Sequence, residues 1–139
     1  MHSPILAPVV CLVAWSMVMW TWMYVTRLPA MGKAKMKPDP FAPRGEQMNQ
    51  LPAEVRWKAD NYNHLMEQPT LFYAITLALA LLGQGDGINL WLAWAYVVIR
   101  VLHSLLQSLV NKIELRFVLF FLSSLALIGL TANALLSVF

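Results

Sequence analysis

Glu67 is an acidic side chain at the start of a long apolar stretch that is predicted to cross a membrane. It belongs to a polar run, residues 60–69, which reads Asp-Asn-Tyr-Asn-His-Leu-Met-Glu-Gln-Pro. A carboxylate at membrane depth costs roughly 3 kcal/mol on insertion scales, so such side chains usually serve binding, catalysis or proton transfer. Glu67 is therefore the first candidate for a functional residue.

Two sets of polar side chains repeat at helical spacing. On a helix that turns about 100° per residue, each set occupies a sector about 100° wide. The first set comprises Asp60, Asn63, His64 and Glu67, and the second comprises Arg100, His103, Ser104, Gln107 and Asn111. The first set lies early in its helix and the second lies late in the next, antiparallel helix, so both should reach the same depth. We expect a shared polar cavity, with Glu67 and Arg100 as a candidate ion pair.

The composition is that of a membrane protein. Of the 139 residues, 59% are hydrophobic and 12% are charged, whereas a soluble domain is about one quarter charged. Roughly 20 apolar residues span a bilayer as a helix, and the candidate spans are residues 4–26, 53–82, 90–111 and 115–138. We therefore predict one all-α domain, residues 1–139, that forms an integral membrane four-helix bundle. Pro69 lacks an N–H, so the second helix should kink beside Glu67.

The first connection, residues 27–52, is rich in proline and basic residues. Its prolines exclude a continuous helix, and it would serve either as a lid over a site or as a simple solvated loop. All ten Lys and Arg residues lie in this connection, in the turn before residue 115 or in helix segments on the same side. The positive-inside rule places that side in the cytoplasm and both termini outside, with membrane lipids as partners; we expect a bacterial inner membrane. This distribution explains the net charge of +3 without nucleic acid binding.

The expected cavity carries an excess of basic groups from Arg100, His103 and Arg116. Arginine offers a fork of donors that matches a carboxylate, and Glu67 would accept a bond from an amine. Glutathione has two carboxylates, one amine and a thiol, so it matches this inventory, as do other amphipathic anions. The residues also allow a structural role, in which Glu67 and Arg100 fix the register of two helices. Cys11 is the only cysteine, so no paired-cysteine metal motif is present.

Three features occur together in the chain: Asn-His-Leu-Met-Glu-Gln-Pro at residues 63–69, Arg-Val-Leu-His at residues 100–103, and Arg116. In these features the chain resembles the MAPEG family, the membrane-associated proteins in eicosanoid and glutathione metabolism. The resemblance runs from the second helix to the start of the fourth, and the four-span layout agrees with it. It implies a four-helix bundle that assembles as a homotrimer, with glutathione bound between neighbouring subunits on the cytoplasmic side.

The resemblance also implies roles for individual residues. The residues matched to glutathione contacts are Glu67, Arg100, His103, Asn63 or His64, and Gln107. Arg116 matches an arginine near the glutathione sulfur, which in active members stabilises the thiolate, the true nucleophile. Gln107 and Phe120 stand where other members carry polar aromatic residues, and Asp60 stands where some carry arginine.

The leading hypothesis is a glutathione-dependent membrane transferase or peroxidase that acts on apolar electrophiles or lipid hydroperoxides. A second is a non-enzymatic membrane module that binds a lipid, an amphipathic anion or a partner protein in the same cavity. A third is a small proton-coupled exporter built around Glu67. The one-sided distribution of Lys and Arg disfavours exporters that insert in both orientations. Arg100 also leaves no simple empty pathway around Glu67.

Overall fold

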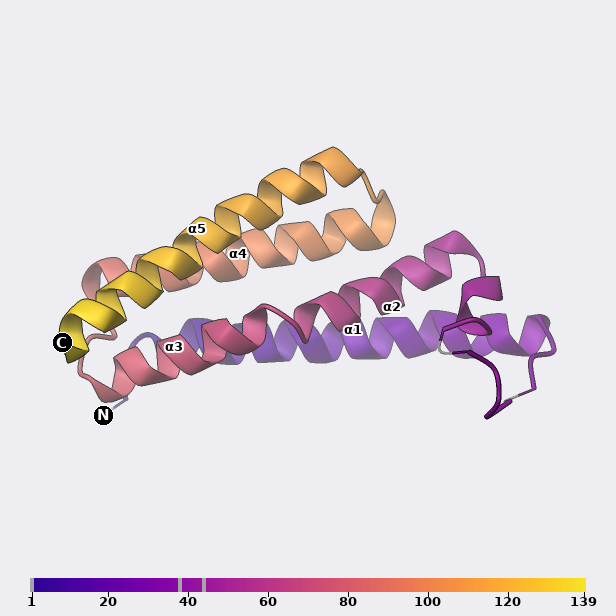
Figure 1. Cartoon of the computed structure of the whole chain (residues 1–139), viewed down its shortest axis with the longest axis horizontal. Coiled ribbons are helices and arrows are strands. Elements are labelled where there is room, and N and C mark those ends of the chain that lie inside the picture. Colours follow the sequence, from indigo (N-terminus) through magenta and orange to yellow (C-terminus); the bar gives the residue numbers. More distant parts are fainter. Residues whose placement is uncertain (1, 38, 44) are drawn as a thin grey trace.

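The chain folds into helices that run back and forth along one long axis (Figure 1). The computed structural model describes residues 2–37, 39–43 and 45–139. Its elements are α1 (Leu6–Lys33), the short 3-10 helix η1 (Met48–Gln50), α2 (Ala53–Leu65), α3 (Pro69–Leu81), α4 (Gly87–Leu109) and α5 (Ile113–Val138). No strand occurs in these described ranges. Because α2 and α3 follow one another along α1, the predicted all-α four-helix arrangement is confirmed.

The connections between the helices lie at alternate ends of the bundle (Figure 1). Both termini and the turn between α3 and α4 lie at one end, which we call the terminal end. The connection of residues 34–52 and the turn between α4 and α5 lie toward the opposite end, which we call the loop end. Helices α4 and α5 form an antiparallel hairpin, and α1 packs against α2, α3 and α4.

Among the described residues, three helices are long and apolar enough to cross a membrane, namely α1, α4 and α5. The predicted helix over residues 53–82 is divided into two helices, α2 and α3, of 13 residues each. In the turn between them, the N–H groups of Met66 and Glu67 donate to carbonyls three residues earlier, at 3.0 and 3.2 Å. The interruption lies where the kink was predicted, beside Glu67, but the prediction of one continuous helix is wrong. Pro69 explains the break, because it lacks an N–H and begins α3 at a position where no intrahelical donor is needed.

Helix α1 is longer than the predicted span of residues 4–26, and it continues through Pro29 to Lys33. The described part of the connection is not one continuous helix, as predicted, but its first residues, including Pro29, extend α1. This proline and Val25, whose carbonyl it leaves without a donor, both lie on an exposed face of α1. Because both positions are exposed, the carbonyl that lacks its donor is not enclosed in the bundle, so the helix tolerates the proline.

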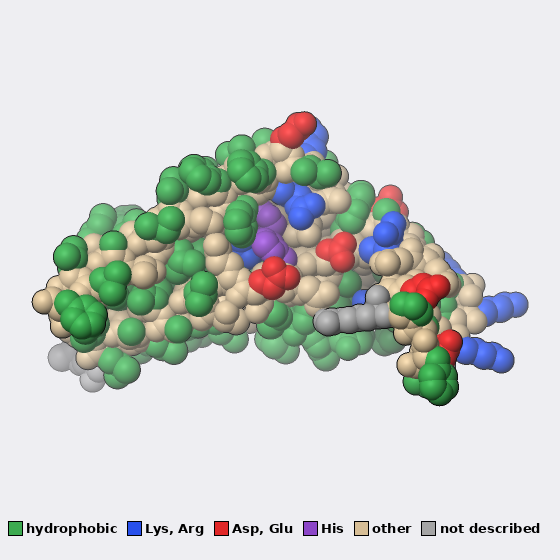
Figure 2. All heavy atoms as spheres, viewed as in Figure 1, with side chains coloured by type: hydrophobic (Ala, Val, Ile, Leu, Met, Phe, Trp, Pro, Cys, Tyr) green, Lys and Arg blue, Asp and Glu red, His purple; other side chains and the backbone are tan. Residues whose placement is uncertain are grey.

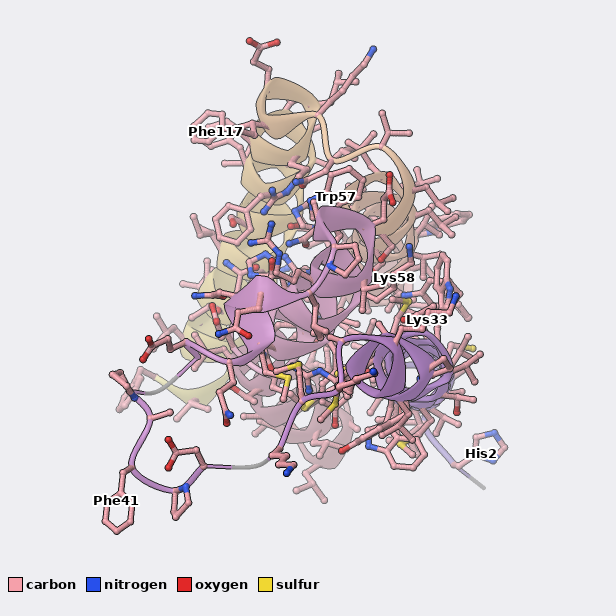
Figure 3. All side chains as sticks on the ribbon, turned by 90° about the vertical axis from the view of Figure 1, so that its right-hand side faces the viewer. His2, Lys33, Phe41, Trp57, Lys58 and Phe117 are labelled. Atoms are coloured by element: carbon pink, nitrogen blue, oxygen red, sulfur yellow. The ribbon has the colours of Figure 1, made fainter. Side chains whose placement is uncertain are left out.

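The rest of the first connection is held by one glutamine. Gln47 Nε2 donates to the carbonyl of Lys37 at 2.8 Å, and Gln47 Oε1 accepts the N–H of Asp39 at 3.2 Å. Phe41 projects from this connection and is almost fully exposed (Figure 3). Pro38 and Arg44, which belong to the predicted proline-rich and basic connection, lie outside the described residues.

The outer surface of the bundle is apolar, and its interior is partly polar. Val10 and Val25 of α1 and Phe121 and Ile128 of α5 are more than half exposed, and apolar side chains cover much of the face drawn in Figure 2. By contrast, α4 buries six polar side chains, namely Asn89, Arg100, His103, Ser104, Gln107 and Ser108. A bundle surrounded by lipid places its polar groups in this way, against one another and away from the hydrocarbon.

Candidate functional site

The predicted polar face of the third span lies on α4 and points into the bundle. Arg100, His103, Ser104 and Gln107 are all buried, and Arg100 has no exposed surface at all. Asn111, the last member of this set, lies beyond the end of α4 and is only partly buried. The spacing of these residues on one helical face therefore agrees with their burial.

The predicted polar face of the second span is rotated relative to expectation. Asp60, Asn63 and Glu67 are exposed, and only His64, at the edge of the set, is turned toward α4. The helix instead buries Asn61, which the sequence did not single out. The burial of Asn61 could have been predicted from its position one helical turn before Leu65, which is also buried and belongs to the core. The two polar faces therefore meet through one residue.

His64 lies between the two residues that were predicted to form an ion pair. Arg100 Nη1 is 3.3 Å from His64 Nε2, and Arg100 Nη2 donates to the His64 carbonyl at 3.4 Å. His64 Nδ1 is 3.6 Å from Glu67 Oε2. Within the described residues, no contact of 4.0 Å or less joins Glu67 to Arg100, so the predicted direct ion pair is wrong. Arginine only donates, so His64 Nε2 must accept and the proton of a neutral imidazole lies on Nδ1, facing Glu67.

Arg100 is a buried cation without a carboxylate partner. Among the described residues no acidic oxygen lies within 4.0 Å of its guanidinium, and its Nε has no hydrogen-bond acceptor. The guanidinium lies 5.9 Å from the Tyr96 ring and 5.7 Å from the Phe120 ring, which gives it weak cation–π contacts. A buried charge without a counter-charge is costly, so an anionic group placed here would be strongly attracted.

A cavity of about 330 Å³ lies beside His64 and is lined by His64, His103, Ile113, Arg116, Phe117 and Phe120, so Arg100 is separated from it by the residues that it contacts. Figure 2 shows histidine side chains in a hollow of the surface, with basic and acidic side chains around them. The His64 ring lies 5.0 Å from the His103 ring and 5.4 Å from the Phe120 ring. The wall of the cavity is thus formed by flat rings, with cationic groups at its edge.

Helix α5 supplies four of the lining residues at positions i, i+3, i+4 and i+7, which is one helical face. Of these four, the sequence singled out Arg116 and Phe120 but missed Ile113 and Phe117. Arg116 Nη1 donates to Asn111 Oδ1 at 2.6 Å, and its Nε is buried without an acceptor. Ile113 and Phe117 do follow helical spacing in the sequence, but apolar residues at this spacing are equally typical of a helix face that contacts lipid.

The remaining predicted site residues lie away from this cavity. Glu67 contacts His64 from outside, and its side chain is 71% exposed. Gln107 is buried, with its Oε1 unpartnered among the described residues. Asn63 and Asp60 line a second cavity of about 160 Å³, which Arg27, Arg56 and the end of the first connection also border. The connection therefore covers this second cavity and does not line the one beside Arg116.

The arrangement suits an anion that carries an apolar group. The cavity is lined by the Arg116 guanidinium and two imidazoles, and Arg100 contacts one of them, His64, at 3.3 Å. Phe117 is 67% exposed and Ile113 74% exposed, so the apolar side of the cavity faces the surface of the bundle. In Figure 3 the Phe117 side chain projects away from the helix axis toward that surface.

Comparison with known proteins identifies the family. The model of the MAPEG family matches residues 5–136, which is nearly the whole chain. Comparison with curated proteins and comparison with solved structures each return no match. With its helical bundle and apolar outer surface, the chain is an integral membrane protein of the type found in glutathione and eicosanoid metabolism, and it belongs to the MAPEG family.

Proposed function

We propose that the protein is a glutathione-dependent membrane transferase or peroxidase. The observation that carries this proposal is the buried guanidinium of Arg100, which has no carboxylate within 4.0 Å among the described residues. Glutathione has two carboxylates and a thiol, so it would supply the missing negative charge. The guanidinium of Arg116 and the imidazoles of His64 and His103 line the cavity, and Arg100 contacts His64 from the interior, so donors and positive charge surround such a ligand.

Arg116 is proposed to act on the sulfur. Its guanidinium lines the cavity, and Asn111 holds one side of it at 2.6 Å. A fixed positive charge beside a thiol favours the thiolate, which is the reactive nucleophile. His103 lines the same cavity, and we assign it to glutathione binding. The thiolate then forms a carbon–sulfur bond, either by displacing a leaving group from the electrophile or by adding to it with uptake of a proton. With a hydroperoxide, the thiolate attacks the terminal oxygen and the O–O bond breaks, which releases an alcohol after protonation and leaves glutathione sulfenic acid. A second glutathione converts this to the disulfide and water.

The co-substrate is proposed to be an apolar molecule that partitions into the bilayer. Phe117 and Ile113 form an apolar side of the cavity and are largely exposed on the bundle surface. A hydrophobic electrophile or lipid hydroperoxide dissolved in lipid would therefore reach the cavity from the side. A water-soluble co-substrate would gain nothing from this wall.

The site is proposed to be completed by neighbouring copies of the chain in a homotrimer. Asp60, Asn63 and Glu67 are exposed on one protomer, although they belong to the segment, α2 and α3, that we propose passes through the membrane. A carboxylate exposed to hydrocarbon is costly, so this face requires a protein or aqueous neighbour. A second copy that covers this face would bring further polar groups to glutathione at the subunit boundary, where Glu67, Asn63 and His64 contribute contacts.

We place the loop end on the cytoplasmic side and both termini outside, in a bacterial inner membrane. The basic residues of the connection and of the turn between α4 and α5 support this orientation through the positive-inside rule. The cavity beside Arg116 then opens in the cytoplasmic half of the bundle, where glutathione is available.

Calorimetric titration of the detergent-solubilised protein with glutathione tests the proposal. We expect wild type to bind glutathione and Arg100→Gln to lose binding at least tenfold, because the counter-charge for the carboxylate is removed. Light scattering would report the mass of the assembly for both proteins, which should be unchanged. Lys112→Gln is the matched control, because it removes an exposed cation near the same cavity. Equal affinity in wild type and Arg100→Gln would contradict the proposal.

A further inference from the structure

Gln68 lies in the break between α2 and α3, and its side chain joins this break to two other helices. Gln68 Nε2 donates to Ser124 Oγ of α5 at 2.9 Å, and Gln68 Oε1 accepts the hydroxyl of Tyr96 of α4 at 3.1 Å. Ser124 Oγ in turn donates to the carbonyl of Phe120 at 2.8 Å. Both ends of the Gln68 amide are therefore engaged, which holds the side chain in one orientation.

The backbone of the break is weakly held by comparison. Met66 and Glu67 donate only to carbonyls three residues earlier, and Pro69 has no N–H. A continuous helix fixes the direction of its next turn through a bond at every residue. Here that continuity is interrupted, so the angle between α2 and α3 must be set by side chains that reach other elements.

The partners of Gln68 also border the candidate site. Phe120 lines the cavity, and its ring lies 5.4 Å from His64 and 5.7 Å from the Arg100 guanidinium. The Tyr96 ring lies 5.9 Å from the same guanidinium and stacks on Phe72 of α3 at 4.4 Å. The network of Gln68 thus ends on residues that surround Arg100.

We infer that Gln68 is a positioning residue, which fixes the break between α2 and α3 and so holds His64 and Glu67 in place against Arg100. Glu67 directly precedes Gln68 and His64 lies four residues before it, at the end of α2, so a change in the angle of the break moves both relative to α4. Interhelical hydrogen bonds in membrane proteins each change an equilibrium by about 3- to 30-fold. The effect on the break is independent of any ligand, whereas the effect on glutathione affinity rests on the proposed function.

Hydrogen exchange measured by mass spectrometry on the full-length protein tests the first effect. Gln68→Leu keeps a side chain of similar size but removes both hydrogen bonds. We expect the amides of residues 65–72 to exchange about 3- to 30-fold faster than in wild type. Asn133→Leu is the matched control, because Asn133 Nδ2 donates to Asn89 Oδ1 at 2.7 Å and also joins α5 to α4, but toward the terminal end. This control should leave exchange at the break unchanged.

Gln68→Glu distinguishes hydrogen bonding from simple packing. A protonated carboxyl has one acceptor oxygen and one donor, so it can keep both contacts. A carboxylate has no donor, so it can bond to Ser124 only if the serine hydroxyl leaves the carbonyl of Phe120, which breaks the network at its next contact. We expect exchange at the break, relative to wild type at the same pH, to lie close to wild type at low pH and to be faster at high pH. A ratio that does not change with pH would show that the hydrogen bonds do not set the break.

Glutathione titration of the same variants tests the second effect. Gln68→Leu should raise the dissociation constant by about 3- to 30-fold, and Asn133→Leu should leave it unchanged. If wild type binds no glutathione, the proposed function fails, and the exchange measurement alone decides the inference about the break. Unchanged exchange at residues 65–72 in Gln68→Leu, or an equal increase in Asn133→Leu, would overturn the inference.

Discussion

His64 is the residue on which the site depends, because it is the one member of the α2 polar set that reaches α4. It accepts from Arg100 through Nε2 and directs Nδ1 at Glu67, so it transmits the influence of an exposed carboxylate to a buried cation. A direct ion pair between Glu67 and Arg100 would leave the cation neutralised and unable to attract a ligand. The observed arrangement leaves Arg100 available for an anion.

Asn61 is a buried polar residue whose replacement is predicted to change the stability. Its side chain is fully buried, and neither amide atom has a hydrogen-bond partner among the described residues. An unsatisfied buried polar group costs about 1–3 kcal/mol, so Asn61→Leu, which keeps the number and branching of the side-chain heavy atoms, should raise the free energy of unfolding by up to that amount. Thermal or denaturant unfolding in detergent measures the change.

The control for this prediction is Asn49→Leu, because Asn49 lies in η1 and is exposed. We expect it to change the stability by less than about 0.5 kcal/mol. A loss of stability in Asn61→Leu would contradict the account, since it would mean that ordered water or a neighbouring subunit satisfies the amide.

At the scale of elements, the turn between α4 and α5 connects the fold to the proposed chemistry. Asn111 has a positive φ of 57°, a conformation that asparagine tolerates better than most residues. Its side chain also accepts the 2.6 Å hydrogen bond from Arg116. One residue therefore shapes the turn and holds the guanidinium at the edge of the cavity.

Two substitutions separate these roles. Asn111→Gly keeps the positive φ but removes the acceptor, so stability should stay close to wild type while Arg116 loses its fixed position. Asn111→Ala also removes the acceptor, and it adds about 1–2 kcal/mol of strain from the left-handed conformation. Both variants should therefore stabilise the glutathione thiolate less than wild type does, but only Asn111→Ala should unfold more easily. An unaltered thiolate level in both variants would contradict a positioning role for Asn111.

The sequence allowed some elements to be predicted and not others, for physical reasons. Helices α1, α4 and α5 were predictable because their apolar stretches are long, and the polar face of α4 because its spacing is regular. The rotation of α2 could not be predicted, because helical spacing groups Asp60, Asn63 and Glu67 on one face without showing what that face contacts. Pro69 indicated that the helix would be distorted near Glu67. The contacts of Gln68 at the break could not be predicted, because its partners lie on other helices.

For the whole molecule, we propose that the bundle binds glutathione and activates its thiol. The family match over residues 5–136 and the apolar outer surface establish the membrane fold. The basic cavity between α2, α4 and α5 carries the functional claim. The proposed binding of glutathione depends on the whole bundle, because the lining residues come from three helices that only the packed fold brings together.

The ultraviolet absorbance of the thiolate, followed while glutathione is added to the purified protein at neutral pH, tests this claim most directly. We predict a saturable thiolate signal in wild type and its loss in Arg116→Ala, with glutathione affinity retained within severalfold, because a fixed cation favours the ionised sulfur. Lys112→Ala, which removes a neighbouring exposed cation, should keep the signal. The absence of a thiolate in wild type, or equal signals in wild type and Arg116→Ala, would contradict the account.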